Sequence, residues 1–257
     1  MAVPRAIRDR EGMKGRLVAA GFLLALVAAL AAMAAGLGSR AELWSFRAGF
    51  QILRWAAWGG LAAAAVSLVG LGRALLRPAP GRGRALLVGA LGVALGLTVV
   101  WVPWSWKQRA ESVPPIHDIT TDLADPPAFE AVLPLRRDAP NPSEHEGESV
   151  AALQREGYPD LGPLTLEVPP DAAFRRALRA AREMGWEIVE SDPARRRIEA
   201  TATTLWFGFR DDVVVRVRPA PGGSRVDVRS VSRVGRSDVG TNARRIREYL
   251  EKVDAAD

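Results

Sequence analysis

The chain has 257 residues, 48% of them hydrophobic, and a formal net charge of +6 at pH 7. It contains no cysteine, which excludes disulfide bonds, thiolate metal sites and cysteine nucleophiles. Residues 1–111 hold 14 basic and 4 acidic residues, whereas residues 112–257 carry a net charge of −4. The positive charge lies outside the part that could fold as a soluble domain, so we expect no nucleic-acid partner.

Three stretches in the first part carry no charged residue: Leu17–Gly38, Trp55–Gly72 and Ala85–Trp106. A helix needs about 20 apolar residues to cross the hydrocarbon core of a bilayer. The second stretch extends back to Ile52 if Arg54 snorkels to the interface. We therefore expect a transmembrane region over residues 1–110, with helices at about residues 17–38, 52–72 and 85–106.

The charges between these stretches predict their orientation. The N-terminal tail holds five basic residues, and four arginines lie between Arg73 and Arg84, while the first loop has few. The positive-inside rule places the tail and the second loop in the cytoplasm, and the C-terminal domain outside after three crossings. The predicted location is the cytoplasmic (inner) membrane, with a periplasmic or extracytoplasmic domain and the lipid bilayer as a partner. Tryptophans near the start of the second helix and near the end of the third indicate that these two points lie at the same depth in the membrane.

Small residues in these helices leave alternatives open. Ala32–Ala34 resembles a cleavage site, so the first stretch could be a cleaved signal peptide. Gly92 and Gly96 form a GxxxG motif, which serves either oligomerisation or packing within the bundle; we favour packing. No acidic residue or histidine lies in the core of a span, so a transporter or pump is not expected.

Residues 111–163 are rich in proline and predict an extended strap packed on the following domain, with one short helix near residues 149–156. Disorder is the alternative, but the strap has many apolar anchors. His117, Asp118 and Asp122 lie close together in sequence, and such side chains can ligate zinc or iron. We favour a loop in which the carboxylates cap turns, and expect no cofactor.

Residues 164–257 predict an α+β domain. A strand at 164–168 is followed by a helix that Asp171 caps and Gly185 ends. Four strands follow, in which apolar and polar residues alternate as in half-buried strands. A last amphipathic helix spans about residues 239–253. The order β-α-β-β-β-β-α predicts one antiparallel sheet with two helices, similar to helix-grip domains.

Two long runs are distinctive: Ile198–Arg218, which contains the sequence TTLWFGFRDD, and Ser224–Arg247, which contains SDVGTNARRIR. Together with PIHDITTD at Pro115–Asp122 and YPD at Tyr158–Asp160, they resemble the bacterial "domain of unknown function 1499" family. The resemblance covers about residues 112–253, and three preceding membrane helices are a familiar arrangement for that family. It implies no known activity and no catalytic residues. Some relatives carry a cysteine pair in the strap, which is absent here.

The distinctive runs supply the candidate binding residues: Trp206, Phe207, Phe209, Arg233, Arg236 and Arg244. The aromatic side chains either fill the core at a bend of the sheet or form a lip that binds acyl chains or a partner. The arginines, beside a helix start that Ser237 and Asp238 could cap, either bind a phosphate or carboxylate or pair with the acidic strap. We favour the structural alternative in both cases.

No catalytic motif is present, and the sequence predicts a membrane-anchored binding protein. Its extracytoplasmic domain would bind a lipid, an envelope component or a protein partner. One alternative is a metal-dependent or hydrolytic enzyme that uses His117 and the carboxylates near it. The other is an assembly factor for a membrane complex, with the three helices as its interface.

Overall fold

The computed structural model describes residues 5–76 and 81–256, with side chains from residue 16 onward. The chain divides into two compact units. One contains Met1–Gln108 together with the short segment Trp206–Gly208, and the other contains Arg109–Leu205 and Phe209–Asp257.

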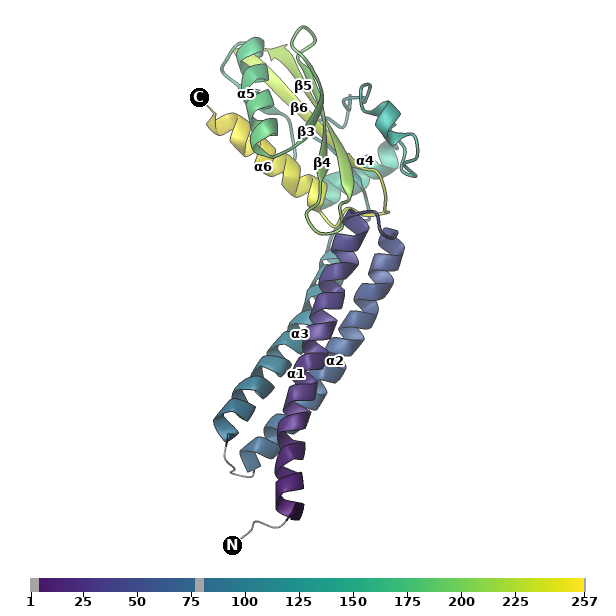
Figure 1. The fold of residues 1–257 in the computed structure, drawn as a ribbon. Coiled ribbons are helices and arrows are strands. Elements are labelled where there is room, and N and C mark those ends of the chain that lie inside the picture. Colours follow the sequence, from purple (N-terminus) through teal and green to yellow (C-terminus); the bar gives the residue numbers. More distant parts are fainter. Residues whose placement is uncertain (1–4, 77–80, 257) are drawn as a thin grey trace. The chain divides into compact units, whose positions relative to one another are not determined.

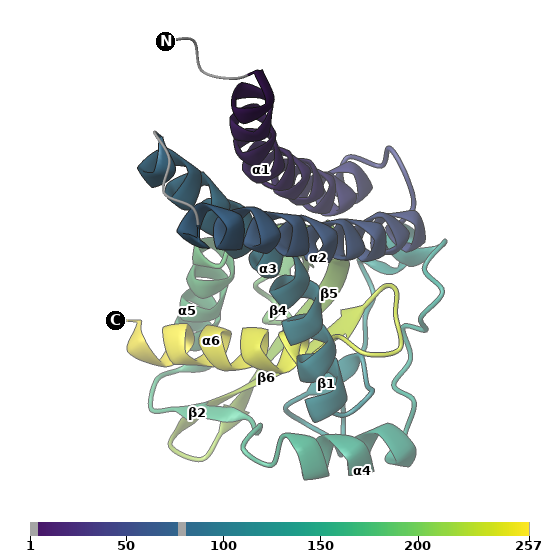
Figure 2. The ribbon, with the colours of Figure 1, turned by 90° about the horizontal axis from the view of Figure 1, so that it is seen from below.

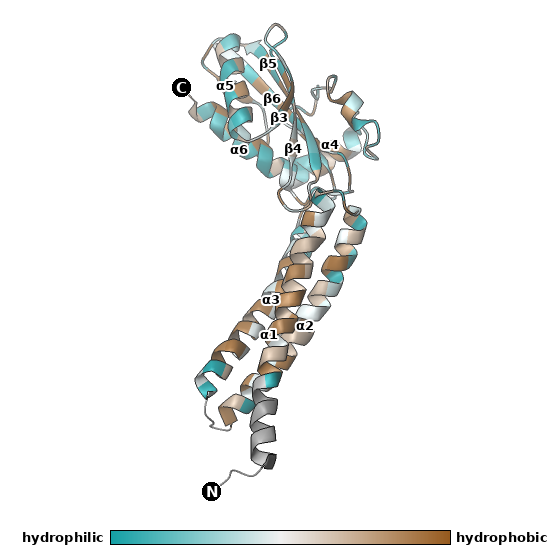
Figure 3. Cartoon of the chain, in the orientation of Figure 1, coloured by the Kyte–Doolittle hydropathy of each residue, from teal (hydrophilic) through white to brown (hydrophobic). Residues whose placement is uncertain are grey.

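Three long helices build the first unit: α1 (Arg5–Arg40), α2 (Phe46–Leu76) and α3 (Arg82–Ser112). All three are long and apolar enough to cross a membrane, which confirms the predicted membrane helices. Hydrophobic residues dominate their length (Figure 3). Each helix is longer than its predicted span, because the charged residues that border the apolar stretch continue the helix. Arg77, which contributed to the predicted orientation, lies outside the described residues.

Small residues bring the three helices close together. Ser67 on α2 is fully buried, and a Cβ added at Gly21 on α1 or at Gly92 on α3 would collide with it. Gly60 and Gly96 meet backbone to backbone, with the Gly60 oxygen 2.6 Å from a Cβ added at Gly96. The GxxxG glycines therefore serve packing within the bundle, as the favoured interpretation predicted.

The same crossing confirms the level predicted for the tryptophans. Because Gly60 also lies against Val99, the first half of the antiparallel α2 runs beside the second half of α3. Trp55 and Trp58 precede Gly60, and Trp101 and Trp104 follow Val99 by similar distances along the chain. All four indoles are at least 55% exposed, as expected of interfacial side chains that face lipid headgroups.

The second unit is a mixed α+β domain (Figure 1). Its strands are β1 (Asp118–Thr120), β2 (Leu164–Leu166), β3 (Glu187–Asp192), β4 (Arg197–Thr203), β5 (Arg210–Ala220) and β6 (Gly223–Ser232). Its helices are the 3-10 turn η1 (Leu133–Arg136), α4 (Glu148–Gly157), α5 (Pro170–Glu183) and α6 (Thr241–Ala255). From residue 164 onward this is the predicted order of elements.

The strands form one antiparallel sheet in the order β1-β6-β5-β4-β3, and β2 pairs with the other half of β6. Helices α5 and α6 lie side by side on one face of the sheet (Figures 1 and 2). Alternate valines of β5 and β6 point to these helices and form the main core with residues such as Phe174, Trp186 and Ile246. Trp186 stacks on Tyr249, with ring centroids 4.7 Å apart.

Three local expectations differ from the structure. Strand β1 was not predicted, because three residues are too short to show a periodic pattern. Asp171 does not cap α5; the helix begins at Pro170, and Asp171 instead accepts a hydrogen bond from Arg196. The middle strands are not half-buried: nearly every residue of β4 and β6 is buried on both faces. Gly185 does end α5, with the positive φ of 71° that glycine tolerates.

Candidate functional site

The face of the sheet opposite the helices is covered by the strap. Phe129 and Val132 of the strap pack on Val214 of β5 and Val231 of β6 in a small second core. Around this apolar patch the same strands present charged side chains, because alternate residues of a strand point to opposite faces. The strap therefore buries an ionic surface as well as an apolar one.

Each buried carboxylate on this face accepts several hydrogen bonds. Asp212 is fully buried and accepts from Arg136 at 2.6 Å and from Arg233 at 2.8 and 2.9 Å. Glu199 is also fully buried; it pairs with Arg197 and accepts the backbone N–H groups of Glu130 and Val132. Such charge-assisted bonds satisfy groups that would otherwise be costly to bury.

Asp118 and Asp122 belong to the same set of buried ion pairs between the sheet and the strap, which we call the ionic layer. Both oxygens of Asp118 accept from Arg229, at 2.9 and 2.8 Å, with both side chains 2% exposed. Asp122 pairs with Arg216, Arg218 and Arg225. Burial raises the pKa of Asp122, but backbone N–H groups and the nearby guanidinium groups outweigh burial, so that its net pKa lies below the ordinary value.

The structure does not assemble the candidate metal ligands. Asp118 and Asp122 are held by different arginines, and Nε2 of the buried His117 has no hydrogen-bond partner among the described residues. Within the described part of the chain, no three His, Asp or Glu side chains are grouped to hold a metal ion. The carboxylates of the proposed site instead neutralise arginines of the sheet.

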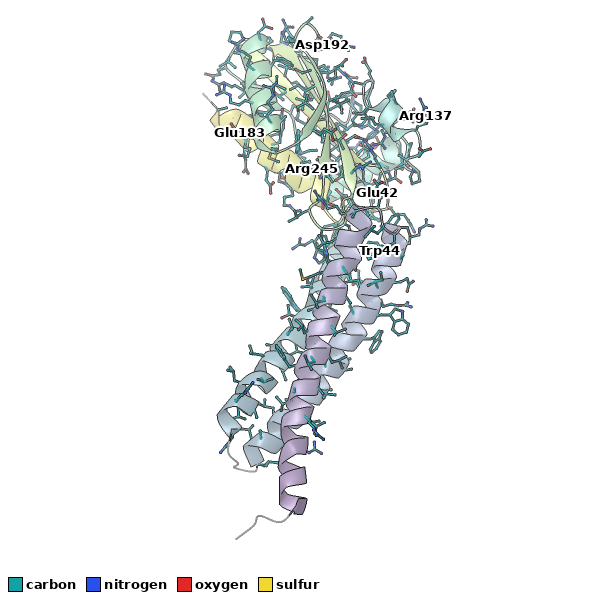
Figure 4. All side chains as sticks on the ribbon, viewed as in Figure 1. Glu42, Trp44, Arg137, Glu183, Asp192 and Arg245 are labelled. Atoms are coloured by element: carbon teal, nitrogen blue, oxygen red, sulfur yellow. The ribbon has the colours of Figure 1, made fainter. Side chains whose placement is uncertain are left out.

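A second polar cluster lies under the start of α6, at the end of the sheet where β1 begins and β6 ends. Arg245 pairs with Asp211 at 2.6 Å, and the Asn242 amide donates to the His117 carbonyl and to Ser232. Ser230 completes the cluster by donating to Asn242 at 2.8 Å. Figure 4 labels Arg245 in this position. The separate distinctive motifs of the sequence thus meet in space.

The start of α6 already holds an anion. The Asp238 carboxylate accepts the backbone N–H groups of Gly240 at 2.9 Å and Asn242 at 2.6 Å, which confirms its predicted capping role. Burial raises the pKa of Asp238. The hydroxyl of Tyr158 is buried near Gly240 with no hydrogen-bond partner in the described structure, and burial raises its pKa to about 12. An external phosphate would have to displace the chain's own carboxylate from this helix terminus.

The aromatic candidates lie in the turn between β4 and β5, and the structure separates them. Trp206 and Phe207 belong to the compact unit of the membrane helices. In that unit Phe207 contacts Phe50 with ring centroids 4.9 Å apart, and a Cβ added at Gly36 would collide with the Trp206 indole. Phe209 is half-buried in the other unit, where its N–H donates to the Thr204 hydroxyl. None of these three rings therefore belongs to the main core of the domain.

The arginine candidates also separate. Arg233 binds Asp212 and is part of the ionic layer beneath the strap. Arg236 is exposed and has no ion pair among the described residues, whereas Arg244 is exposed and lies 3.9 Å from Glu248. The acidic strap does pair with arginines, but mainly with Arg216, Arg218, Arg225 and Arg229, which the strand pattern assigned to a solvent-facing side.

Sequence reasoning missed the most deeply buried ionic residues, Arg229, Asp212, Glu199 and Asp227. One signal was available: these residues alternate with valine or alanine along β4, β5 and β6 and carry charges of opposite sign on neighbouring strands. Such a pattern permits cross-strand pairs. It does not reveal that another segment covers them.

Comparison with known proteins adds a family but no activity. The family model described as a protein of unknown function, DUF1499, matches residues 118–253, from the first residue of β1 to the last turn of α6. No curated protein matches the chain. The match spans more than half of the chain and includes both the ionic layer and the cluster under α6. The chain therefore belongs to the DUF1499 family, in which the α+β domain here follows three helices able to cross a membrane.

Proposed function

We propose that this protein is a membrane-anchored binding module of the cell envelope. Three helices hold it in the cytoplasmic membrane with its N-terminus in the cytoplasm, and the DUF1499 domain works on the outer side. There it binds a lipid, another envelope component or a protein. The orientation rests on the basic residues of the N-terminal tail and of the second loop.

The binding role is supported by one observation: the buried carboxylates of the domain are already paired with arginines of the same domain. Asp118, Asp122 and Asp212 each accept hydrogen bonds from arginines, and so do Asp211 and Glu199. A general acid or base must be free to exchange a proton with a substrate. Carboxylates held in this way serve the fold instead, so the exposed surface is the part that remains for function. The same pairing weakens the alternative of a metal-dependent or hydrolytic enzyme that uses His117.

Native mass spectrometry of the full-length protein, purified in mild detergent from its own membranes, tests the binding role. The control is a chain that ends after α3. A lipid or protein that is enriched on the full-length chain, but not on the control, supports binding by the domain. A protein enriched equally on both supports the assembly-factor alternative. If nothing is enriched on the full-length chain, the binding role is wrong.

Cysteine labelling tests the orientation, and the absence of native cysteine makes it clean. Gly162 in the domain and Gly83 in the first turn of α3 both have open space where a Cβ would be placed. We expect a membrane-impermeant maleimide to label Gly162→Cys in intact cells stripped of their outer layers. Gly83→Cys should react only after the membrane is permeabilised. The reverse pattern would place the domain in the cytoplasm.

A further inference from the structure

The arginines of the domain differ in their partners. Most are bound to carboxylates of the same domain: Arg136, Arg155, Arg195, Arg196, Arg197, Arg216, Arg218, Arg225, Arg229, Arg233, Arg245 and Arg247. Among the described residues without such a partner, Arg137 and Arg236 are isolated exposed side chains, whereas four lie together on α5: Arg175, Arg176, Arg179 and Arg182, which we call the α5 stripe. Within the described residues the structure gives none of these four side chains an ion pair or a hydrogen bond.

The α5 stripe follows from the amphipathic pattern of the helix. Ala173, Phe174, Ala177, Ala180 and Ala181 face the core. The arginines therefore take the opposite face, where Arg175, Arg179 and Arg182 are exposed and Arg176 is partly exposed. At a rise of about 1.5 Å per residue, the stripe is on the order of 10 Å long.

In the part of the chain that the structure describes, no carboxylate forms an ion pair with the stripe. Asp171, at the start of α5, pairs with Arg196 at 2.6 Å, and Glu183, at its end, lies 3.8 Å from Lys252 of α6. Figure 4 labels Glu183 at the end of the helix. Like charges three and four positions apart on a helix repel one another. The charges of the stripe therefore repel one another, and within the described residues no ion pair offsets this repulsion.

We propose that the α5 stripe is a docking surface for the phosphate headgroups of an anionic lipid bilayer. The inference rests on the proposed binding role and names a surface and a partner for it. All four side chains are arginine, whose planar guanidinium group binds phosphate oxygens in pairs. The fully exposed positions of α5 carry no aromatic or large apolar side chain. A protein interface is usually anchored by such residues, whereas peripheral attraction to a charged surface does not need them.

The test uses the full-length protein in nanodiscs of phosphatidylcholine, which is zwitterionic and leaves the stripe free. These are mixed with vesicles of phosphatidylcholine alone or with phosphatidylglycerol added, and binding is measured by flotation at low and high salt. The variant replaces the four stripe arginines with glutamine. A matched control replaces four exposed arginines elsewhere that are not among the candidate binding residues: Arg137, Arg155, Arg195 and Arg210. Both variants carry the same net charge, and the thermal unfolding of each is measured.

We expect the wild type and the control to bind the anionic vesicles, and high salt to weaken this binding. The stripe variant should bind on the order of a hundredfold more weakly, because each basic residue near an anionic surface contributes about fivefold before screening. A second variant with lysine at the four positions keeps the charge and should regain part of the affinity. This rescue separates an effect on the surface from a loss of folding.

Three results would overturn the inference. The first is equal binding of the wild type to both kinds of vesicle, and the second is an equal loss of affinity in the stripe variant and in the control. The third is tighter binding of polyglutamate to the wild type, per charge, than of the anionic vesicles, which would make the partner an acidic protein. In each case the enrichment measured by native mass spectrometry decides separately whether the domain is a binding module at all.

Discussion

The two faces of the sheet are built from the same strands but packed by different chemistry. Under α5 and α6 the strands present valine, alanine and isoleucine, and the space is filled by apolar side chains. Under the strap they present arginine, aspartate and glutamate, with a small apolar patch around Phe129. Helices can cover a face with an apolar stripe, whereas an extended segment offers backbone carbonyl and N–H groups. Those groups are what the buried arginines and Glu199 bind.

This difference has an energetic consequence. An apolar face loses stability in proportion to the volume removed, because truncation leaves a cavity. An ionic face loses stability when one charge is left without its partner, and replacing the whole group by apolar side chains is often neutral. Substitutions on each face can therefore test whether the helix face is stabilised by apolar packing and the strap face by the pairing of buried charges.

The largest effect is expected for Asp212→Ala. The substitution leaves the guanidinium groups of Arg136 and Arg233 buried without the carboxylate that they bind. We expect a loss of about 3–5 kcal/mol in the free energy of unfolding, and a lower melting temperature of the full-length protein in detergent, measured by near-UV circular dichroism.

A triple variant sharpens this prediction. Arg136→Met, Arg233→Met and Asp212→Leu together remove all three charges and keep most of the volume. It should be more stable than Asp212→Ala alone. If both variants are destabilised equally, the three ionic side chains stabilise the fold by their mutual attraction, and the cost of an unpaired charge does not explain the effect of Asp212→Ala.

The next effect is expected for Ile246→Ala on the helix face. Ile246 is fully buried in the main core, so the substitution removes apolar contacts and leaves a cavity. We expect a loss of about 2–4 kcal/mol in the same measurement. Ile246→Val, which removes only one methylene, serves as the graded control and should cost about 1 kcal/mol. A cost for Ile246→Val as large as that of Ile246→Ala would contradict the cavity argument.

A smaller, pH-dependent effect is expected for Asp122→Asn. Its pKa in the folded domain lies below the ordinary value of 3.8, mainly because of the N–H groups and arginines that outweigh burial. Its ionised form therefore stabilises the fold above pH 3.8, and this contribution is lost as the pH falls through the folded pKa. The variant should be less stable at neutral pH and should lose less stability on acidification.

Melting temperatures measured from pH 7 to about pH 3 test the sign of this effect. Asp254→Asn, at an exposed position on α6, is the control and should follow the wild type. A wild type and an Asp122→Asn variant with parallel curves would show that the ionic layer does not depend on this carboxylate.

The smallest effect is expected for Glu183→Gln. Its pair with Lys252 is 3.8 Å long, and the two side chains are 55% and 44% exposed. Exposed pairs of this kind contribute about 0–1 kcal/mol, and a negative charge at the end of a helix is slightly unfavourable. We expect a change within about 0.5 kcal/mol. A larger loss of stability would show that an exposed ion pair stabilises this domain as much as a buried one does.

Much of the fold could be predicted from local patterns. Long charge-free stretches predicted the three membrane helices, since a bilayer imposes a length that composition alone reveals. Alternation in the β4, β5 and β6 regions and the helical spacing of α6 predicted the order of elements, because each has a period that repeats several times. The Asp238 cap was predictable for the same reason, since it acts on residues next to it in the chain.

The candidate site was less predictable. Trp206 and Arg233 are distinctive in sequence, yet one lies with the membrane helices and the other in the ionic layer. His117, Asp118 and Asp122 lie within six positions, but in the described structure they do not form a group that could hold a metal ion. Nearness in sequence did not indicate which side chains would meet, because residues of a strand and of the turn after it can point in different directions.

The sequence by itself determined where the chain can cross a membrane and the order of helices and strands from residue 164 onward, and its motifs showed the resemblance to the family. Only the tertiary structure decided that the strap buries the second face, that Asp118 and Asp122 bind arginines, and that the four arginines of α5 are left without carboxylates. The physical reason is the range of the interactions. Periodicity and capping act within a few residues, whereas Asp118 and Arg229 are 111 residues apart and meet only when the sheet forms.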